Sequence, residues 1–236
     1  MLGSFYPNFS PYFRGMTALG IEAFSQLAEQ GLTIIDIRNT ELLKQGFVKG
    51  SISLCSPAIF GAQIGMLSGF SLSSGFSPVL LVGDAVQDFE PFLQQLPNGS
   101  NSWVKGYLEG GFDAWEKAGG AVDLIIDVEV DELIMDIPFD ENLVIMDIRP
   151  AVNFGNGHLK DAVSLPLAQI NDPLRISAIE ENDNLYIVGE NDDEAFLAAT
   201  VLKKQDIHNL RVVLGGWEAI QSEKKAQIVK EPGMLN

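Results

Sequence analysis

Short apolar runs alternate with helical stretches along this chain, and the same alternation occurs twice. We expect helices over Met16–Gln30, Phe89–Leu96 and Phe112–Ala118. The expected strands are largely apolar: Thr33–Ile37, Ser51–Leu54, Val79–Val82 and Ser102–Val104, then Leu143–Met146, Ala162–Leu165, Leu185–Val188 and Leu210–Val213. Short apolar strands that alternate with helices are typical of parallel strands covered on both faces. The pattern therefore predicts an α/β fold with doubly wound, mainly parallel sheets.

Five blocks of sequence recur in the same order, 105 to 111 residues further along. Leu32–Arg38 returns as Leu143–Arg149, and Gly46–Lys49 returns as Gly157–Lys160. The other matched pairs are Ser53-Leu54 with Ser164-Leu165, Leu81–Gly83 with Ile187–Gly189, and Gly110–Ala114 with Gly215–Ala219. Ordered repetition of this kind predicts a tandem duplication, with one domain over residues 16–120 and a second over residues 121–236.

The domain boundary and the N-terminal segment have their own signals. Gly119-Gly120 ends the last expected helix of the first copy, so we place the boundary there. Residues 1–15 precede the first copy, and Phe5–Phe13 holds five aromatic residues broken by two prolines. A free polar linker would not contain so many aromatic side chains. We expect an arm that lies across an apolar surface.

Charge narrows the functional classes. The chain has 236 residues, with 15 Lys+Arg against 32 Asp+Glu and a net charge of −17. Residues 1–122 contribute −4 and residues 123–236 contribute −13, which also suggests two units. Such a chain repels phosphate backbones and anionic lipid, so we expect neither nucleic-acid binding nor membrane binding. The chain also lacks an apolar run near the roughly 20 residues of a membrane span.

Cysteine and histidine counts narrow the chemistry further. One cysteine excludes an intramolecular disulfide and a Cys-rich zinc site, and with no signal peptide the sequence predicts a cytoplasmic protein. Two histidines, His158 and His208, cannot build a multi-histidine metal centre. We expect no metal and no cofactor.

The repeated motifs resemble those of a known family. The second copy contains Asp147-Ile148-Arg149, Gly157–Ala162, Ser164–Pro166 and Leu214–Trp217, and the first contains Asp36-Ile37-Arg38, Gly46–Gly50 and Gly106–Gly111. This ordered set resembles the rhodanese domain, and the resemblance covers nearly the whole chain. It implies two rhodanese-like domains, each a small parallel sheet with helices on both faces. Enzymes of this family carry a cysteine after the central strand, in a Cys-x-x-Gly-x-Arg type of loop. The thiolate takes up a sulfane sulfur as a persulfide, which backbone N–H groups and a basic side chain stabilise.

Neither copy has that cysteine. Gly83 follows the central strand of the first copy and Gly189 follows that of the second, where the family places its nucleophile. The loops 83–88 and 189–194 contain no Lys or Arg, and the second has four carboxylates in six residues. Because carboxylates repel an anionic sulfur donor, we expect both sites to be vestigial.

Cys55 is the alternative nucleophile. It follows the strand Ile52-Ser53-Leu54 and matches Pro166 of the second copy. We expect it to be a partly buried, small apolar side chain, which is how most free cysteines behave. The alternative is a reactive thiol that carries a persulfide.

For the other candidate residues we favour a structural role over a catalytic or ligand-binding one. We expect His158, whose counterpart is Phe47, to be packed and hydrogen-bonded, and His208 to lie at the surface. For Asp36/Arg38 and Asp147/Arg149 we expect structural ion pairs and loop hydrogen bonds at the strand ends rather than catalytic groups. The acidic run Glu190–Glu194 suits a solvated helix start better than a cation site. Trp115 and Trp217 fall on apolar helix faces and are expected in the core.

A narrower resemblance concerns chains in which a metallo-β-lactamase-fold persulfide dioxygenase or hydrolase precedes rhodanese-like domains. The segments Ser10–Phe13 and Val104–Trp115 are similar to parts of those chains, while a His-x-His-x-Asp-His zinc motif is absent. The favoured hypothesis is a catalytically degenerate tandem rhodanese-like protein with a binding, regulatory or scaffolding role in sulfur metabolism. Its partner would be a protein or a fused enzyme domain, with a homodimer as a further option.

Three alternatives stay open at this point. The chain is an active sulfurtransferase or persulfide carrier that uses Cys55, or it is the C-terminal part of a metallo-β-lactamase-fold persulfide enzyme. In the third, it is a structural interaction module in which Phe5–Phe13 docks a partner or a second copy.

Overall fold

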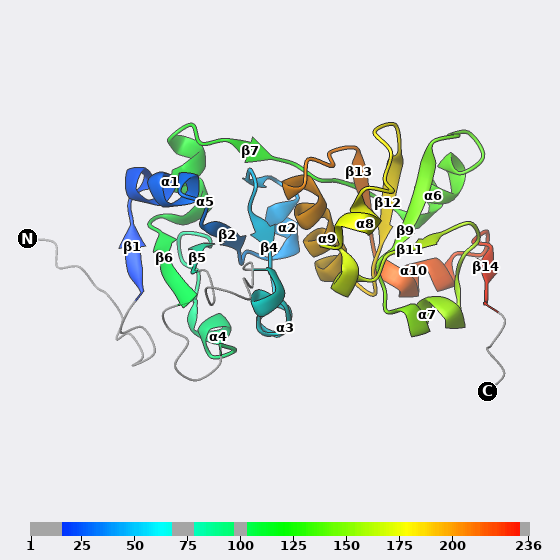
Figure 1. Cartoon of the computed structure of the whole chain (residues 1–236), viewed down its shortest axis with the longest axis horizontal. Coiled ribbons are helices and arrows are strands. Elements are labelled where there is room, and N and C mark those ends of the chain that lie inside the picture. The colour runs from blue at the N-terminus through cyan, green and yellow to red at the C-terminus, as the bar shows by residue number, and fades with distance from the viewer. Residues whose placement is uncertain (1–15, 68–77, 97–102, 232–236) are drawn as a thin grey trace, which may run out of the picture. The chain divides into compact units, whose positions relative to one another are not determined.

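The computed structural model describes residues 16–67, 78–96 and 103–231 (Figure 1). These residues form two compact units. Described residues of 1–39 and 47–122 belong to the first, and those of 40–46 and 123–236 belong to the second. The expected aromatic arm, residues 1–15, lies outside the described residues. The domain bounds 16–120 and 121–236 stay a prediction.

The first unit is built on a five-stranded parallel sheet with the strand order β1-β6-β5-β2-β4. Its strands are β1 (Thr17–Leu19), β2 (Thr33–Asp36), β4 (Ile52–Ser53), β5 (Val79–Val82) and β6 (Val104–Leu108). The helices are α1 (Ile21–Glu29), α3 (Pro57–Leu67), α4 (Glu90–Leu93) and α5 (Gly111–Lys117), and β3 (Phe47–Val48) pairs with β7 (Val122–Asp123). All four residues of β5 are buried, as expected for a central strand covered on both faces.

The second unit has a parallel sheet in the order β11-β9-β12-β13-β8. Its strands are β8 (Ile126–Val128), β9 (Leu143–Asp147), β11 (Val163–Ser164), β12 (Asn184–Val188) and β13 (Leu210–Val213). The remaining elements are α2 (Thr40–Leu43), α6 (Val130–Asp136), α7 (Ala151–Asn156), η3 (Leu167–Gln169), α8 (Pro173–Ile176), α9 (Asp192–Lys204) and α10 (Gly216–Ser222), with β10 (His158–Leu159) paired to β14 (Ile228–Val229). Counted from β8, this sheet has the same strand order as the first. The predicted fold class, α/β with two parallel sheets flanked by helices, is confirmed.

Alternating side chains of the second sheet supply its two faces. Ile145, Tyr186 and Val213 share one face, where they pack with Leu133 of α6 and Ile220 of α10. The other face of β12 and β13 is covered by α9. Residues 195–202 of this helix are all buried.

The strand predictions hold best in the middle of each sheet. Val79–Val82 and Leu210–Val213 are strands with the bounds expected from the sequence. The expected helix Met16–Gln30 is wrong at its start, since β1 occupies its first turn and α1 begins only at Ile21. Pairing of Thr17 with Gly106 makes this segment an edge strand, which a helical periodicity cannot reveal. The edge strand β8 is likewise absent from the expected elements.

The apolar segments of the chain are too short or too interrupted for a membrane span. In the described parts of the chain, no helix has both the length and the apolar character needed to cross a bilayer. The longest apolar stretch of the sequence, near Ala58 to Phe76, predicts a helix followed by a loop. α3 supplies that helix. Its continuation over residues 68–77 lies outside the described residues.

Gly-Gly turns bring α5 and α10 close to the loops that follow the central strands. Gly111 has φ +63°, and a Cβ atom there would lie 2.4 Å from the carbonyl oxygen of Gly83. Gly216 has φ +56°, and its Cβ would lie 2.4 Å from the carbonyl oxygen of Glu190. Both positions therefore require glycine for a left-handed backbone and for space. The same contact fixes the loop after the central strand in both units.

Gly111→Ala is expected to lower the free energy of unfolding by about 2–4 kcal/mol, because backbone strain and a steric clash add together. Gly119→Ala is the matched control in the same unit, since Gly119 has φ +76° but a Cβ atom there would have nothing within 4 Å. Its cost should be the strain alone, about 1–2 kcal/mol. Urea unfolding followed by tryptophan fluorescence compares the two variants. Equal costs would contradict the close approach.

Candidate functional site

The candidate site lies at the carboxyl ends of the central strands. Gly83 directly follows β5, and Gly189 directly follows β12. Loops at this edge of a parallel sheet are where α/β proteins place their binding and catalytic groups. These two positions are the ones predicted to correspond to the family's nucleophile.

In the second unit, side-chain oxygens of the loop accept hydrogen bonds from nearby backbone N–H groups. Asn191 is the N-cap of α9, and its Oδ1 accepts a hydrogen bond of 3.0 Å from the N–H of Glu194. The Oδ1 of Asp192 accepts one of 2.7 Å from the N–H of Gly215, at the start of α10. A bound anion would need donors of this kind. Here the loop satisfies them with its own side chains.

In the loop of the first unit, carboxylate oxygens likewise accept hydrogen bonds from backbone N–H groups. The Oδ1 of Asp84 accepts a hydrogen bond of 2.9 Å from the N–H of Val86. The Oδ1 of Asp88 accepts another of 2.9 Å from the N–H of Glu90. A Cβ atom at Gly83 would lie 2.7 Å from the Cβ of Gln87, so the space beside Gly83 is already filled.

A cavity of about 410 Å³ opens beside the loop of the second unit. Carboxylates dominate its lining, which consists of Glu190, Asn191, Asp192, Asp193, Gly215 and Glu218. Their combined negative potential disfavours any anion there. The predicted helix start at Glu190–Glu194 is confirmed from Asp192 onward, with Asp192, Asp193 and Glu194 in the first turn of α9.

In this loop the pKa of Glu194 is shifted by its surroundings. Burial raises the pKa of its carboxyl above the ordinary value, and the negative charges of Glu190 and Asp193 raise it further. A backbone hydrogen bond involving Glu190 opposes part of the rise. The surroundings of Glu194 therefore disfavour its negative charge.

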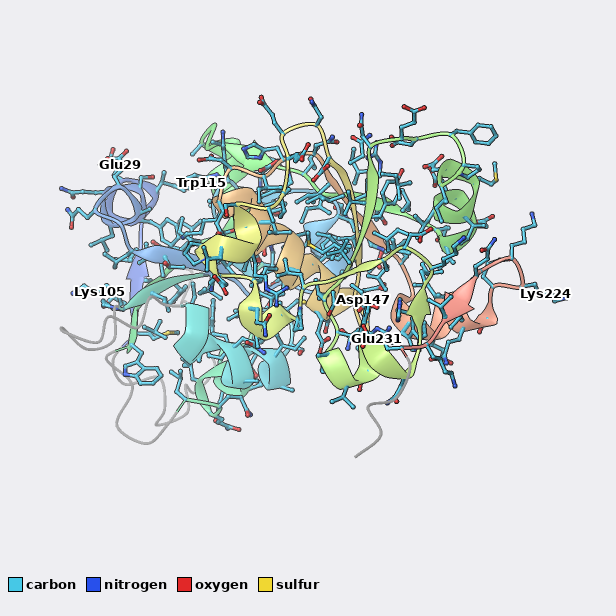
Figure 2. The ribbon with its side chains drawn as sticks, turned by 45° about the vertical axis from the view of Figure 1, so that its right-hand side comes forward. Glu29, Lys105, Trp115, Asp147, Lys224 and Glu231 are labelled. Carbon is cyan, nitrogen blue, oxygen red and sulfur yellow. The ribbon has the colours of Figure 1, made fainter. Side chains whose placement is uncertain are left out.

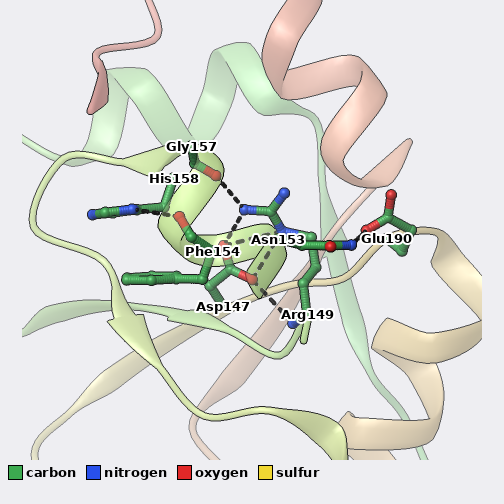
Figure 3. A network of polar contacts seen from close by, with 7 residues as sticks. All are labelled: Asp147, Arg149, Asn153, Phe154, Gly157, His158 and Glu190. Atoms are coloured by element: carbon green, nitrogen blue, oxygen red, sulfur yellow. Dashed lines mark hydrogen bonds and ion pairs between the residues drawn. The ribbon is translucent and has the colours of Figure 1, made fainter. Parts of the chain in front are cut away.

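Behind the loop of the second unit, Asp147 and Arg149 form a buried ion pair (Figure 3). The guanidinium contacts both carboxylate oxygens, with Nη2 2.7 Å from Oδ2 and Nε 3.0 Å from Oδ1. Nη2 also donates to the carbonyl oxygen of Gly157 at 2.7 Å, and the guanidinium lies 3.6 Å from the ring centre of Trp217. Arg149 is only 1% exposed, so its charge serves the fold and does not face the cavity.

The first unit repeats this arrangement. Arg38 Nη2 lies 2.6 Å from Asp36 Oδ2, and the guanidinium lies 3.9 Å from the ring centre of Phe112. Burial raises the pKa of the Asp36 carboxyl, while the hydrogen bonds and charge of Arg38 oppose that rise. Both predicted ion pairs are confirmed. Sequence reasoning missed the stacking on Phe112 and Trp217, although these residues occupy matching places in the repeated Gly-Gly blocks.

The two histidines and the two tryptophans singled out from the sequence differ in their packing and exposure in the structure. His158 is buried, stacks on Phe154 at 3.7 Å between ring centres, and has Nδ1 2.9 Å from the Phe154 carbonyl oxygen. Its packed, hydrogen-bonded role is confirmed, and so is the exposure of His208. Trp115 and Trp217 are partly buried and pack against the cores of their units. Asn153 Nδ2 donates to Glu190 Oε2 at 3.2 Å, which ties α7 to the loop (Figure 3).

Cys55 is half-buried, just beyond the end of β4. In the sheet, Ser53 of β4 and Val82 of β5 both pair with Asp36 of β2. Cys55 and Gly83 therefore follow strands that end at the same edge, two strand spacings apart, or about 10 Å. The sequence alone indicates only that Cys55 is far from the loop along the chain. Its chemical role stays a prediction.

Within residues 16–67, 78–96 and 103–231, the acidic residues do not assemble into a metal site. The described residues contain no group of three or more His, Cys, Asp or Glu side chains arranged to hold a metal ion. In this part of the chain, the carboxylates of the acidic cavity therefore do not converge on one point that could hold a cation.

Comparison with known proteins identifies the family of the second unit. Residues 129–223 match the family described as "Rhodanese-like domain". This range contains the Asp147–Arg149 pair, the loop after β12 and the Gly-Gly turn before α10. A rhodanese-like domain is therefore present in this part of the chain.

One curated relative is the "Putative sulfur carrier protein YrkF" of Bacillus subtilis (strain 168), which is 30% identical over 77 residues. The match covers 33% of this chain and 40% of that protein, so the chain spans well under half of its relative. Among solved structures, the rhodanese-like domain of the Anabaena protein Alr3790 is 19% identical, with a TM-score of 0.41, covering 44% of this chain and 78% of that one. A thiosulfate sulfurtransferase from Pseudomonas aeruginosa is 13% identical, with a TM-score of 0.41, covering 94% of this chain and 46% of that one.

Glu194→Gln is expected to raise the free energy of unfolding at pH 7. The raised pKa of Glu194 means that its ionised form is less favourable in the folded chain than in the unfolded chain. The neutral variant avoids this penalty, with a gain of at most about 1 kcal/mol because the group is half-exposed. The gain should vanish as the pH falls to about 4, where the native carboxyl is itself protonated.

Chemical denaturation at pH 4 and pH 7 measures this difference. Glu181→Gln is the control, because Glu181 is exposed and lies outside the acidic loop 189–194. It should change stability by less than about 0.5 kcal/mol at either pH. A loss of stability at pH 7 in Glu194→Gln would show that the helix terminus, not its acidic neighbours, controls this carboxylate.

Proposed function

We propose that this chain is a catalytically degenerate rhodanese-like protein of sulfur metabolism, which binds or regulates a sulfur-handling partner and forms no persulfide in its own loops. The observation that carries the proposal is the state of the two loops. Glycine occupies each position after the central strand, and carboxylate or amide oxygens of the same loop take up the N–H groups of Val86, Glu90, Glu194 and Gly215.

Sulfur transfer through such a loop requires a thiolate and a site that stabilises negative charge. The thiolate attacks the sulfane sulfur of the donor, the donor's sulfur–sulfur bond breaks, and the persulfide anion stays on the protein. Free backbone N–H groups and a cation would hold that anion. In this chain the N–H groups of Glu194 and Gly215 already donate to side chains of the loop, and Arg149 is buried against Asp147 and Trp217.

We extend the proposal to both units, as tandem rhodanese-like domains. Its support is the shared strand order of the two sheets, the repeated Asp-x-Arg pair stacked on an aromatic ring, and the repeated close approach of a Gly-Gly turn. A double loss of the nucleophile position favours a role in recognition. The partner would be a sulfur-handling enzyme in the cytoplasm, as a separate protein or a fused domain. A homodimer of this chain is a separate option.

The first test is a cyanide-dependent thiosulfate sulfurtransferase assay on the full chain and on Cys55→Ser. Both proteins should show no turnover above the uncatalysed rate. Mass spectrometry after treatment with a persulfide donor should find no stable adduct of one sulfur on Cys55. Turnover in the native chain that Cys55→Ser abolishes would overturn the proposal and establish Cys55 as a persulfide carrier.

The second test asks whether the loop of the second unit stabilises a thiolate. Gly189→Cys in a Cys55→Ser background gives a chain with a single thiol, whose alkylation rate is measured against pH. We expect an apparent pKa above the ordinary value of about 8.5, because the neighbouring carboxylates disfavour the thiolate. The introduced Cβ would approach the carbonyl oxygen of Asn191 to 2.9 Å, so circular dichroism must first show that the variant is folded.

Gly83→Cys in the same background is the comparison variant, because its loop carries only Asp84 and Asp88. Its Cβ would approach the Cβ of Gln87 to 2.7 Å, so circular dichroism must show that this variant is folded as well. Its thiol pKa should be raised less than that of the Gly189→Cys thiol. An apparent pKa well below 8 in either variant would show that the loop still stabilises an anion. That outcome would contradict the degenerate-site proposal.

A further inference from the structure

A second cavity, of about 280 Å³, lies in the second unit and is lined by residues from the end of α6, from β10 and the turn after it, and from the segment before β14. Its apolar lining includes Ile134, Ile137 and Leu159. Leu159 is buried, while Ile137 is 41% exposed. Cavities of roughly 300 Å³ and above accommodate small organic ligands, so this one suits a small ligand with an apolar body.

The charged residues of this cavity distinguish it from the rest of the chain. Lys160 and Lys225 line it together with Asp161, which gives a net charge of +1 within a unit that is strongly acidic. Neither lysine ammonium has an ion-pair partner among the residues that the structure describes. Two ammonium groups therefore stand beside an apolar lining without a carboxylate paired to them.

The backbone holds these lysines in defined places. The N–H of Lys160 donates to the carbonyl oxygen of Gln227 at 2.8 Å, which links the β10 side of the cavity to the segment before β14. Lys225 is anchored by its own N–H, which donates to Glu223 Oε1 at 2.9 Å. The two lysines thus approach the cavity from the two segments that this pairing joins.

We propose that this cavity binds a small organic anion with an apolar body, such as an aliphatic carboxylate. The apolar chain would pack on Ile134, Ile137 and Leu159, and the carboxylate would lie between the ammonium groups of Lys160 and Lys225. Charge complementarity selects an anion over a cation, and the apolar lining selects it over inorganic phosphate or thiosulfate.

Asp161 is expected to weaken the binding of an anion in this cavity. Its backbone has φ +65°, and the matching residue of the first unit is Gly50, with φ +81°. Asp161 is a carboxylate at the rim of a site for anions, so it should weaken binding by repulsion. Asparagine tolerates the same left-handed backbone, so Asp161→Asn removes the charge without changing the turn.

This cavity is separate from the loop after β12. The two cavities have no lining residue in common. α6 follows β8, so it starts at the carboxyl edge of the sheet and runs back toward the amino edge, where Ile137 and Pro138 end it. A ligand bound here would leave the acidic loop free for the partner of the proposed function, and neither inference depends on the other.

The probe is sodium octanoate, titrated into the full chain labelled at the isoleucine methyl groups. The methyl signals of Ile134 and Ile137 should shift with a common saturation curve, while that of Ile207, which is outside the cavity, should not. Lys160→Gln and Lys225→Gln should each weaken octanoate binding about two- to fivefold, and added salt should weaken it in the native chain. Asp161→Asn should strengthen it.

Lys224→Gln is the matched control, because Lys224 lies next to Lys225 in sequence but outside the cavity, with its side chain extended from the ribbon near β14 (Figure 2). Its affinity for octanoate should equal that of the native chain. Octylammonium, with the same apolar chain and the opposite charge, should bind more weakly than octanoate. The proposal fails if octylammonium binds equally well, or if the Lys160→Gln/Lys225→Gln double variant binds octanoate as tightly as Lys224→Gln.

Discussion

The buried contact between aspartate, arginine and an aromatic ring organises both units of this chain. Asp147 is the last residue of β9, and Arg149 follows two residues later and pairs with it. The guanidinium of Arg149 also donates to the carbonyl oxygen of Gly157 and stacks on the ring of Trp217. One guanidinium thus joins β9, the turn before β10 and the helix α10. A buried ion pair gives little net stability, but removal of either partner leaves an unpaired charge in the core. The arrangement therefore specifies how these elements meet more than it adds to stability.

The neighbouring loop depends on this arrangement, and its chemistry is opposite to that of an anion site. With the arginine held in the core, the cavity beside α9 is left with carboxylates. The loop's own oxygens accept hydrogen bonds from the N–H groups of Glu194, in the first turn of α9, and of Gly215, at the Gly-Gly turn. Structural capping and anion binding compete for N–H groups of this kind. In this loop capping has taken these two.

Much of the fold could be predicted from sequence, because buried central strands show a continuous apolar signal. Val79–Val82 and Leu210–Val213 are examples, and the i, i+2 spacing of Asp147 and Arg149 was enough to indicate an ion pair. The edge strands β1 and β8 escaped prediction because their conformation comes from pairing with a neighbour. The stacking of Arg149 on Trp217 and the cavity near Lys160 and Lys225 join segments that are distant in sequence, which no local pattern encodes.

The Gly-Gly turns separate the shape of the loop from its chemistry. Gly216 packs against the backbone at Glu190, and Gly111 packs against the backbone at Gly83, so the path of each loop is set by main-chain contact. Side chains that point away from this contact can change without moving the loop. A protein built this way can exchange reactive residues for acidic ones and still present the same surface outline, so that a partner able to recognise the outline could bind active and inactive versions alike.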